Sequence, residues 1–182
     1  MEKNKEDWKV LRTEYLIRRP WLTARRDEVQ LPDGRIIPEY YVLEYPDWVN
    51  VIAITKDGHF VMERQYRHAL GSTLFEIPCG VIEEGEDPLL AARRELEEET
   101  GYSGGTWTEL MELSANPGTM TNLTYCFLAT DVEKTTEPHL DATEDLSVCL
   151  LSRDEVCELL RHNEIKQSLM VAPLLKYLSK EI

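Results

Sequence analysis

The chain has 182 residues, of which 42% are hydrophobic and 30% are charged, and its formal net charge at pH 7 is -14. This length fits one domain, with or without an N-terminal extension, and the composition is typical of a soluble globular protein. The negative charge argues against nucleic acid as a partner, because phosphate binding needs clustered Lys and Arg. The apolar runs are too short to cross a bilayer, so we expect no membrane partner either.

The N-terminal residues 1–7 carry charges of both signs and precede no apolar core. They therefore resemble neither a secretory signal nor a transit peptide, and we expect a cytoplasmic location. The cysteines are widely spaced, without a Cys-x-x-Cys pair or His partners at the spacing of a zinc site. We expect free, buried thiols at Cys79, Cys126, Cys149 and Cys157.

The first half of the chain alternates strand patterns with turn signals. A Pro-Asp-Gly turn within residues 31–35 and the alternating pattern of residues 39–44 predict a hairpin. Asp57-Gly58 predicts a tight turn between two further strands, at residues 49–55 and 59–66. The meander is expected to continue toward residues 74–77.

The second half begins with a well-delimited helix. Asp87 is suited to the cap, Pro88 to the first turn and Gly101 to the position after the end, which predicts a helix at residues 87–100. Strands are then expected at residues 107–113, 124–131 and 146–152, and helices at residues 154–161 and 165–178. This mixture predicts an α+β fold. Residues 133–144 form the one long loop candidate, and long loops often carry function.

Three glutamates of the expected helix, Glu95, Glu98 and Glu99, fall within an arc of roughly 100°. Like charges at this spacing destabilise a helix unless a cation lies between them. Mg²⁺ suits carboxylate oxygens and shares its remaining sites with substrate phosphates. Arg94, one turn before Glu98, can orient or partly neutralise the carboxylates. In isolation, the stretch could equally be an ordinary surface helix rich in Glu and Arg.

The surrounding residues favour the metal site, because they match every fixed position of the Nudix box, Gly-x5-Glu-x7-Arg-Glu-apolar-x-Glu-Glu-x-Gly-apolar. The matching residues are Gly80, Glu86, Arg94, Glu95, Leu96, Glu98, Glu99, Gly101 and Tyr102. The chain thus resembles the Nudix hydrolases. The resemblance implies a loop-helix-loop on a mixed-sheet α/β/α sandwich.

The resemblance also implies roles for individual box residues. Glu95 and Glu99 would be the principal ligands of Mg²⁺, with Mn²⁺ as the substitute ion, and Glu98 would assist through the metal or through water. Glu86 would stabilise the loop or reach a second metal. The backbone carbonyl of Cys79 would be an extra ligand, while a nucleophilic role for its thiol is the weaker interpretation.

Elements outside the box resemble the ADP-ribose pyrophosphatase branch of the family. These elements are Gln65-Tyr66-Arg67, the Glu-apolar-Pro-x-Gly run at residues 76–80, and Asn116-Pro117-Gly118. In this branch the first strands help to build a homodimer whose substrate cleft draws on both subunits. We therefore expect residues 1–45 to be an N-terminal strand extension that serves in dimerisation, and residues 46–182 to be the Nudix domain.

The same resemblance implies a set of substrate-binding residues. Arg67 would bind a phosphate or ribose oxygen, with Arg64 as a second cationic candidate, and Glu76 would accept from the nucleoside or from Arg67. Gly118 belongs to the Pro-Gly element of the expected cleft. The alternative for both arginines is a surface ion pair, for example with Glu63.

The sequence does not single out one residue as the general base of the reaction. The late acidic loop of this branch often supplies a base or a metal ligand, and Glu144 matches the glutamate of that loop. Ala142 stands where some members carry a second glutamate. The candidates are Glu144, Glu98 and Asp141, with surface charge as the alternative for each.

The sequence thus predicts Mg²⁺-dependent hydrolysis of a nucleoside diphosphate derivative, with cleavage of ADP-ribose to AMP and ribose 5-phosphate as the first hypothesis. A nucleotide sugar such as GDP-mannose, or a dinucleotide, is the alternative substrate, because specificity lies outside the box. A non-catalytic ligand-sensing module is the alternative from another class. Such modules tend to lose box glutamates, and this chain has all of them.

Overall fold

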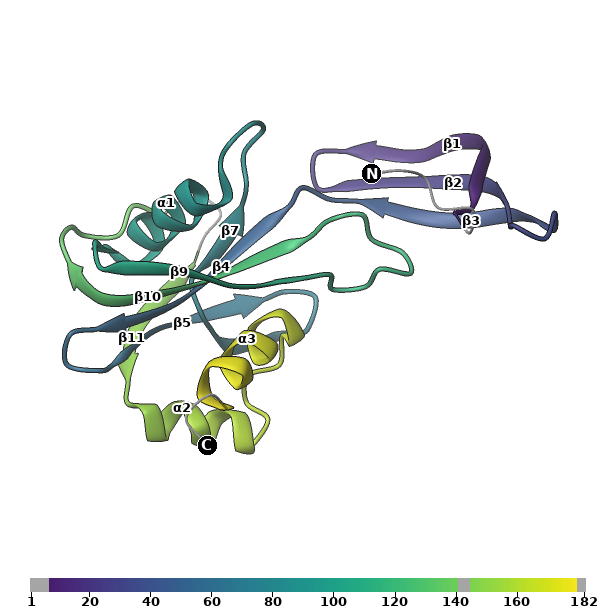
Figure 1. Ribbon diagram of the computed structural model, residues 1–182. Helices are drawn as coiled ribbons and strands as arrows, with labels where there is room; N and C mark the ends of the chain where they lie inside the picture. The colour runs from purple at the N-terminus through teal and green to yellow at the C-terminus, as the bar shows by residue number, and fades with distance from the viewer. Residues whose placement is uncertain (1–6, 141–144, 180–182) are drawn as a thin grey trace. The chain divides into compact units, whose positions relative to one another are not determined.

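The computed structural model describes residues 7–140 and 145–179 (Figure 1). Its contacts divide the chain into two compact units. The first unit comprises Met1–Pro46 and Ser114–Asn122, and the second comprises Asp47–Leu113 and Leu123–Ile182. None of the described helices combines the length and the apolar character that a membrane span requires.

The first unit contains an antiparallel sheet of three strands, in the order β1 (Lys9–Arg19), β2 (Leu22–Gln30) and β3 (Ile36–Glu44). Gly34 turns the chain between β2 and β3 with a φ of 89°, which confirms the predicted hairpin. The sequence did not predict β1, because nearly all of its residues are exposed and no buried face imposes an apolar pattern. Residues 114–122 return to β3 through a hydrogen bond of 2.7 Å from the Leu43 N–H to the Thr119 carbonyl.

The second unit is built on a mixed sheet. Its strands are β4 (Trp48–Thr55), β5 (Phe60–Arg67), β6 (Ser72–Glu76), β7 (Cys79–Val81), β8 (Tyr102–Ser103), β9 (Thr106–Leu113), β10 (Thr124–Lys134) and β11 (Leu146–Leu151). The main path runs β11-β5-β4-β10-β8, while β6 pairs with β5, β7 with β4 and β9 with β10. The pairing of β10 with β4 is parallel and the other pairings are antiparallel.

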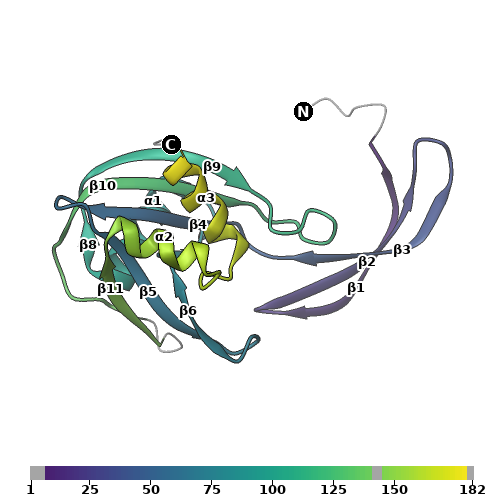
Figure 2. The ribbon, with the colours of Figure 1, turned by 90° about the horizontal axis from the view of Figure 1, so that it is seen from below.

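Helices cover both faces of this sheet (Figures 1 and 2), with α1 (Pro88–Thr100) on one face and α2 (Arg153–Arg161) and α3 (Ser168–Ser179) on the other. Alternate residues of β4 face the two sides of the sheet: Val51 packs in the cluster with α1, and Ile52 packs in the cluster with α2 and α3. The predicted α/β/α sandwich with a mixed sheet is therefore confirmed.

Local signals delimit α1 as the sequence predicts. The Asp87 side chain accepts hydrogen bonds from the N–H groups of Leu89 and Leu90, and Pro88 occupies the first turn. At the other end, Gly101 adopts a φ of 75° and its N–H donates to the Glu97 carbonyl at 2.8 Å. A buried stripe that includes Leu96 then fixes which side chains of α1 face the sheet.

Two expectations need correction. Strand β10 does not end at Asp131: this residue adopts a φ of 60° at a register shift, and the strand continues to Lys134, which pairs with Tyr102. The expected loop therefore begins at residue 135, and its residues 141–144 lie outside the described part of the chain. The four cysteines are free as predicted, but Cys149 and Cys157 are only partly buried.

Candidate active site

Arg94 lies at the centre of the box glutamates. Its Nε donates to Oε1 of Glu86 at 3.0 Å, and its Nη1 donates to Oε1 of Glu95 at 2.8 Å and to Oε2 of Glu98 at 3.0 Å. Its Nη2 donates to the Val81 carbonyl at 3.0 Å, which ties the helix to the end of β7. The hydrogen bonds with Glu86 are the main cause that raises the pKa of Arg94, and in turn they lower the pKa of Glu86.

Gly80 allows the Glu95 carboxyl to lie against the backbone of β7. A Cβ on Gly80 would lie 2.0 Å from Cδ of Glu95. Two carbon atoms that are not bonded cannot approach so closely, so the Glu95 carboxyl would have to move. Only glycine leaves this space, so the first residue of the box positions one of its glutamates by absence of a side chain.

Glu99 is also bonded to a residue of β7. Its side chain is buried, and its Oε2 accepts a hydrogen bond of 2.8 Å from the backbone N–H of Cys79. Burial is the first cause that raises the pKa of the Cys79 thiol, followed by the charges of Glu99, Glu63 and Glu76. A thiol with a raised pKa is a poor nucleophile, which argues against a nucleophilic role for the Cys79 side chain.

The donor chemistry of this group fits a hard divalent cation, because carboxylate oxygens of Glu86, Glu95, Glu98 and Glu99 surround one end of α1 and β7. Within residues 7–140 and 145–179, however, no group of three His, Cys, Asp or Glu stands ready arranged to hold a metal ion. Arg94 engages oxygens of three of these glutamates. A bound cation would take over oxygens that now face the guanidinium.

Arg67 and Glu76 form a second charged pair. Arg67 donates through both Nε and Nη2 to the two carboxylate oxygens of Glu76, and the Nε bond measures 2.8 Å. Glu76 is 1% exposed, whereas Arg67 is partly exposed and can present further N–H groups. The bond to Glu76 raises the pKa of Arg67. The structure therefore brings together two of the residues that the sequence predicts for substrate binding.

The structure does not bring Arg64 into this group, and Gly118 belongs to the first unit. Because side chains alternate along β5, Arg64 points to the face opposite Arg67, where its Cζ lies 5.1 Å from the centre of the Phe75 ring. The carbonyl of Gly118 accepts a hydrogen bond of 2.6 Å from the Tyr40 hydroxyl within the first unit. Two of the candidate bases, Glu144 and Asp141, lie outside the described residues.

The end of α1 is bonded to residues 135–139, a contact that the sequence does not predict. The N–H groups of Thr135 and Thr136 both donate to the Gly101 carbonyl, at 2.8 and 3.2 Å, and the N–H of His139 donates to the Glu98 carbonyl at 2.7 Å. These contacts join backbone atoms, so the types of the residues do not predict them. They attach the beginning of the late loop to the helix that carries the glutamates.

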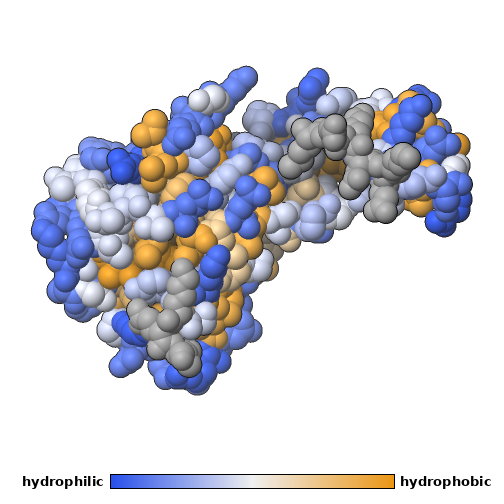
Figure 3. Space-filling model, viewed as in Figure 1, coloured by the Kyte–Doolittle hydropathy of each residue, from blue (hydrophilic) through white to orange (hydrophobic). Residues whose placement is uncertain are grey.

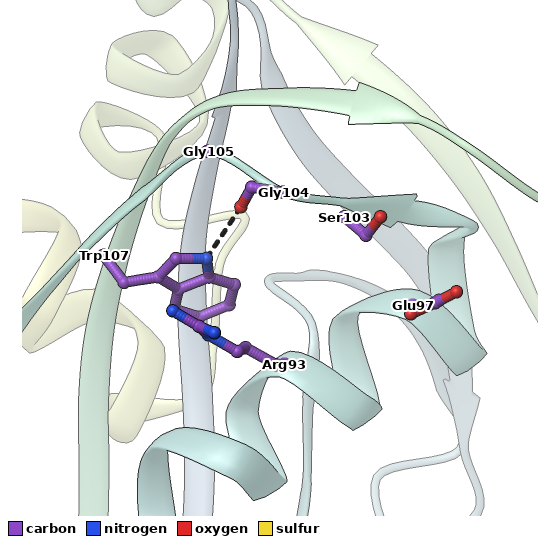
Figure 4. A pocket seen from close by; sticks show the side chains of 6 residues that line it. All are labelled: Arg93, Glu97, Ser103, Gly104, Gly105 and Trp107. Carbon is purple, nitrogen blue, oxygen red and sulfur yellow. Dashed lines mark hydrogen bonds between the residues drawn. The ribbon is translucent and has the colours of Figure 1, made fainter.

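A separate shallow pocket lies on another side of α1 (Figure 4). The Arg93 guanidinium lies 5.5 Å from the centre of the Trp107 ring, and the Trp107 indole N–H donates to the Gly104 carbonyl at 2.7 Å. Glu97 also lines this pocket and is exposed. None of the fixed box residues lines it, so Glu97 offers a matched control for changes in the box glutamates.

Comparison with known proteins assigns this arrangement to a family. Residues 45–172 match the model of the NUDIX domain. The chain belongs to the Nudix family. Residues 8–43 of this Nudix protein match a second model, described as the nucleoside diphosphate sugar hydrolase N-terminal domain.

Curated relatives of this Nudix chain span most of its length. It is 33% identical to the methanol dehydrogenase activator of Bacillus methanolicus over 88% of this chain and 86% of the relative. It is 33% identical to an ADP-ribose pyrophosphatase of Bacillus subtilis over 76% of this chain and 75% of the relative. It is 32% identical to an ADP-ribose pyrophosphatase of Mycobacterium tuberculosis over 93% of this chain and 82% of the relative.

A solved structure shares the fold. The crystal structure of an ADP compounds hydrolase superimposes with a TM-score of 0.84 at 22% identity, covering 98% of this chain and 96% of that one. Together with the intact box, the family assignment makes this Nudix chain a hydrolase that acts on pyrophosphate bonds.

Proposed function

We propose that this Nudix enzyme hydrolyses ADP-ribose to AMP and ribose 5-phosphate in a Mg²⁺-dependent reaction. The observation that carries the proposal is the unbroken set of box glutamates gathered around Arg94, with Glu99 fixed by the Cys79 N–H. Similarity to two bacterial ADP-ribose pyrophosphatases supports the choice of substrate.

In this proposal, Glu95, Glu98 and Glu99 would hold the metal, with Glu86 and the Cys79 carbonyl beside them. Bound Mg²⁺ supplies charge neutralisation at the diphosphate and a lowered pKa for water. Arg94 holds these carboxylates together and would yield some of their oxygens to the bound cation. Arg94 donates hydrogen bonds to Glu86, Glu95 and Glu98, and so lies between these three carboxylates.

The chain's own groups then account for binding and proton transfer. Arg67, whose guanidinium is fixed on Glu76, would direct its remaining N–H groups to a phosphate or ribose oxygen. The Glu98 side chain is 47% exposed and can accept a proton from an attacking water. Glu144 is the other candidate for that role.

The test is AMP release from ADP-ribose with and without Mg²⁺. We expect Glu99→Gln to lower kcat/KM by at least about 100-fold, the upper range for disturbing a metal site. Glu97→Gln makes the same chemical change at an exposed position of the same helix and should retain wild-type activity. Unchanged turnover in Glu99→Gln would refute the metal site.

A nucleotide sugar is the second candidate substrate, and the match of residues 8–43 to the N-terminal domain of nucleoside diphosphate sugar hydrolases favours it. Both substrate classes share a diphosphate and differ at its ends, where the box makes no contact. A panel of ADP-ribose, GDP-mannose and a dinucleotide, each assayed at several concentrations, distinguishes them by kcat/KM. A higher value for GDP-mannose would replace ADP-ribose as the substrate.

We further propose that two copies of the chain associate through the first unit. Strand β1 forms an edge of its sheet, and an edge strand with apolar side chains is prone to associate. Exposed apolar residues lie on and beside it. Part of the apolar surface of the first unit is seen in orange at its right-hand end (Figure 3). They include Trp8, Val10, Leu11, Tyr15, Leu16, Ile17 and Trp21.

Sedimentation or light scattering tests the dimer. We expect the mass of a dimer for the wild type and a shift toward monomer for Leu16→Glu. Leu175→Glu provides the control, because Leu175 is a similarly exposed leucine on α3. A monomeric wild type at the concentrations used for catalysis would refute this part of the proposal.

A further inference from the structure

A groove beside the first turn of α1 is lined by residues to which the proposed reaction gives no role. Its described lining comes from the start of the helix and from β9 and β10, and comprises Asp87, Pro88, Leu89, Trp107, Glu109, Tyr125 and Phe127. Among the described residues, none of the fixed box positions lines it. Its volume of about 240 Å³ lies below the range of about 300–1,000 Å³ that is typical of small-molecule sites, so it fits a single side chain better than a nucleotide.

Aromatic rings form the wall of this groove on the side of the sheet. Tyr125 and Phe127 are two residues apart on β10, so their side chains lie on the same face, and Phe127 packs in the core cluster with α1. Trp107 of β9 lies edge-to-face with Phe127, with the ring centres 6.5 Å apart. This indole already contacts a cation of the same chain, since the Arg93 guanidinium lies over it in the neighbouring pocket (Figure 4). The groove therefore offers aromatic surface of the kind that attracts a cation.

The charged side chains that line the groove are both acidic. Glu109 is exposed, and the strand register places it opposite Phe127, beside the aromatic wall. Asp87 is engaged in the cap of α1, so Glu109 is the carboxylate better placed to meet a ligand. Burial is the first cause that raises the pKa of Tyr125, followed by the charges of three carboxylates, one of which is Glu109. The groove thus combines an aromatic wall with a negative local field.

The charge of the second unit as a whole also favours a basic ligand. Residues 1–46 contain as many acidic as basic side chains, and residues 114–122 contain neither kind. The net charge of -14 therefore belongs entirely to the second unit. Such a charge attracts cationic partners to the surface and repels anionic ones.

We propose that this groove binds an arginine side chain of a partner protein. A guanidinium stacks on aromatic rings and donates paired hydrogen bonds to a carboxylate, which are the groups that Trp107 and Glu109 offer together. A lysine ammonium is more strongly hydrated and does not stack in this way. A free amino acid would bring its own carboxylate into the negative field. Leu90, the next residue after Leu89, is 57% exposed and adds apolar surface that a protein partner would cover.

The test follows the indole N–H signal of Trp107 in the NMR spectrum of protein with isotope-labelled tryptophan, and Trp107→Phe assigns the signal by its loss. The probe is N-acetylarginine methylamide, which is blocked at both ends as in a peptide, and its uncharged match is the same derivative of citrulline. We expect blocked arginine to shift the Trp107 signal in a saturable manner and blocked citrulline to leave it in place. Glu109→Gln should weaken binding by about fivefold, the upper range for an exposed ion pair. Glu97→Gln removes the same charge at an exposed position that does not line the groove, and should retain wild-type affinity.

The possible outcomes separate this partner from other occupants. No saturable shift, an equal shift with blocked citrulline, or unchanged affinity in Glu109→Gln would overturn the proposal. Because Glu109 is exposed, its replacement should leave the fold intact, and an unchanged melting temperature checks this. Tighter binding of free than of blocked arginine would overturn it in favour of a small molecule. A Trp107 signal that moves when the protein alone is diluted would overturn it in favour of a second copy of the chain.

Discussion

The backbone N–H of Cys79 and the carboxylate of Glu99 are joined by a hydrogen bond of 2.8 Å that connects β7 to α1. One turn earlier on the same helix, Glu95 lies against Gly80, the residue after Cys79. Two consecutive residues of a three-residue strand therefore position two glutamates. This relationship explains why the box combines residues of a strand with residues of a helix.

Gly80→Ala tests the packing of Glu95 on β7. The new methyl group would occupy the space of the Glu95 carboxyl and displace it, so we expect kcat/KM to fall about 100-fold, as when a glutamate ligand is misplaced. Steady-state kinetics of Gly80→Ala, Glu95→Gln and the double variant measure the coupling. If both changes act through Glu95, the double variant should be little worse than either single one, and additive losses would contradict this.

Gly101→Ala tests the close approach of the chain at the end of α1. Gly101 and Gly104 have nearly equal φ angles, 75° and 76°, so alanine suffers the same backbone strain of about 1–2 kcal/mol at both. A Cβ at Gly101 would also lie 2.2 Å from the Thr136 carbonyl oxygen, whereas one at Gly104 meets nothing within 4 Å. Urea unfolding should show the larger loss for Gly101→Ala. Equal losses would mean that the Thr136 contact is easily relaxed.

The Arg67–Glu76 pair predicts unequal costs for single and double replacements. Arg67→Met leaves the Glu76 carboxylate buried without its guanidinium, and loss of one partner of such a pair costs about 3–5 kcal/mol. Arg67→Met/Glu76→Gln removes the buried charge as well and should recover much of that loss. Chemical denaturation at pH 7 gives both free energies of unfolding. A double variant less stable than Arg67→Met would show that Glu76 has other stabilising contacts.

Glu155 predicts a pH-dependent contribution to stability. Hydrogen bonds with Ser152 in the capping box of α2 lower the pKa of Glu155 below the ordinary value of 4.5 for a glutamate. A carboxyl with a lowered pKa stabilises the fold above its unfolded pKa, and that contribution is lost as pH falls through the folded pKa. The difference in melting temperature between the wild type and Glu155→Gln should therefore be present at pH 7 and shrink below pH 4.5. A constant difference across this range would exclude the ionised capping box.

Strong local signals explain what sequence alone predicts well. The cap at Asp87, the proline after it and the glycine at the helix end act within a few residues, so α1 has the expected bounds. The mixed sheet and its covering helices follow from the family resemblance. In contrast, β1 has no buried face to impose an alternating pattern, and its residues are held by pairing with β2.

The sequence predicts which residues make up the candidate site better than it predicts how those residues contact one another. Spacing places the glutamates on α1, but it does not show that Arg94 engages three of them or that the Cys79 N–H fixes Glu99. Arg64 and Arg67 are both cationic candidates in the sequence, and the alternation of side chains along β5 places them on opposite faces.

The backbone hydrogen bonds from residues 135–139 to the end of α1 make these two segments open together. For the Thr135 or His139 amide to exchange with solvent, its bond to the Gly101 or Glu98 carbonyl has to break. Native-state hydrogen exchange should thus give these amides the same opening free energy as the Gly101 amide. A cation that tightens α1 would slow the exchange of all of these amides, so the metal site would stabilise residues 135–139 without contacting them.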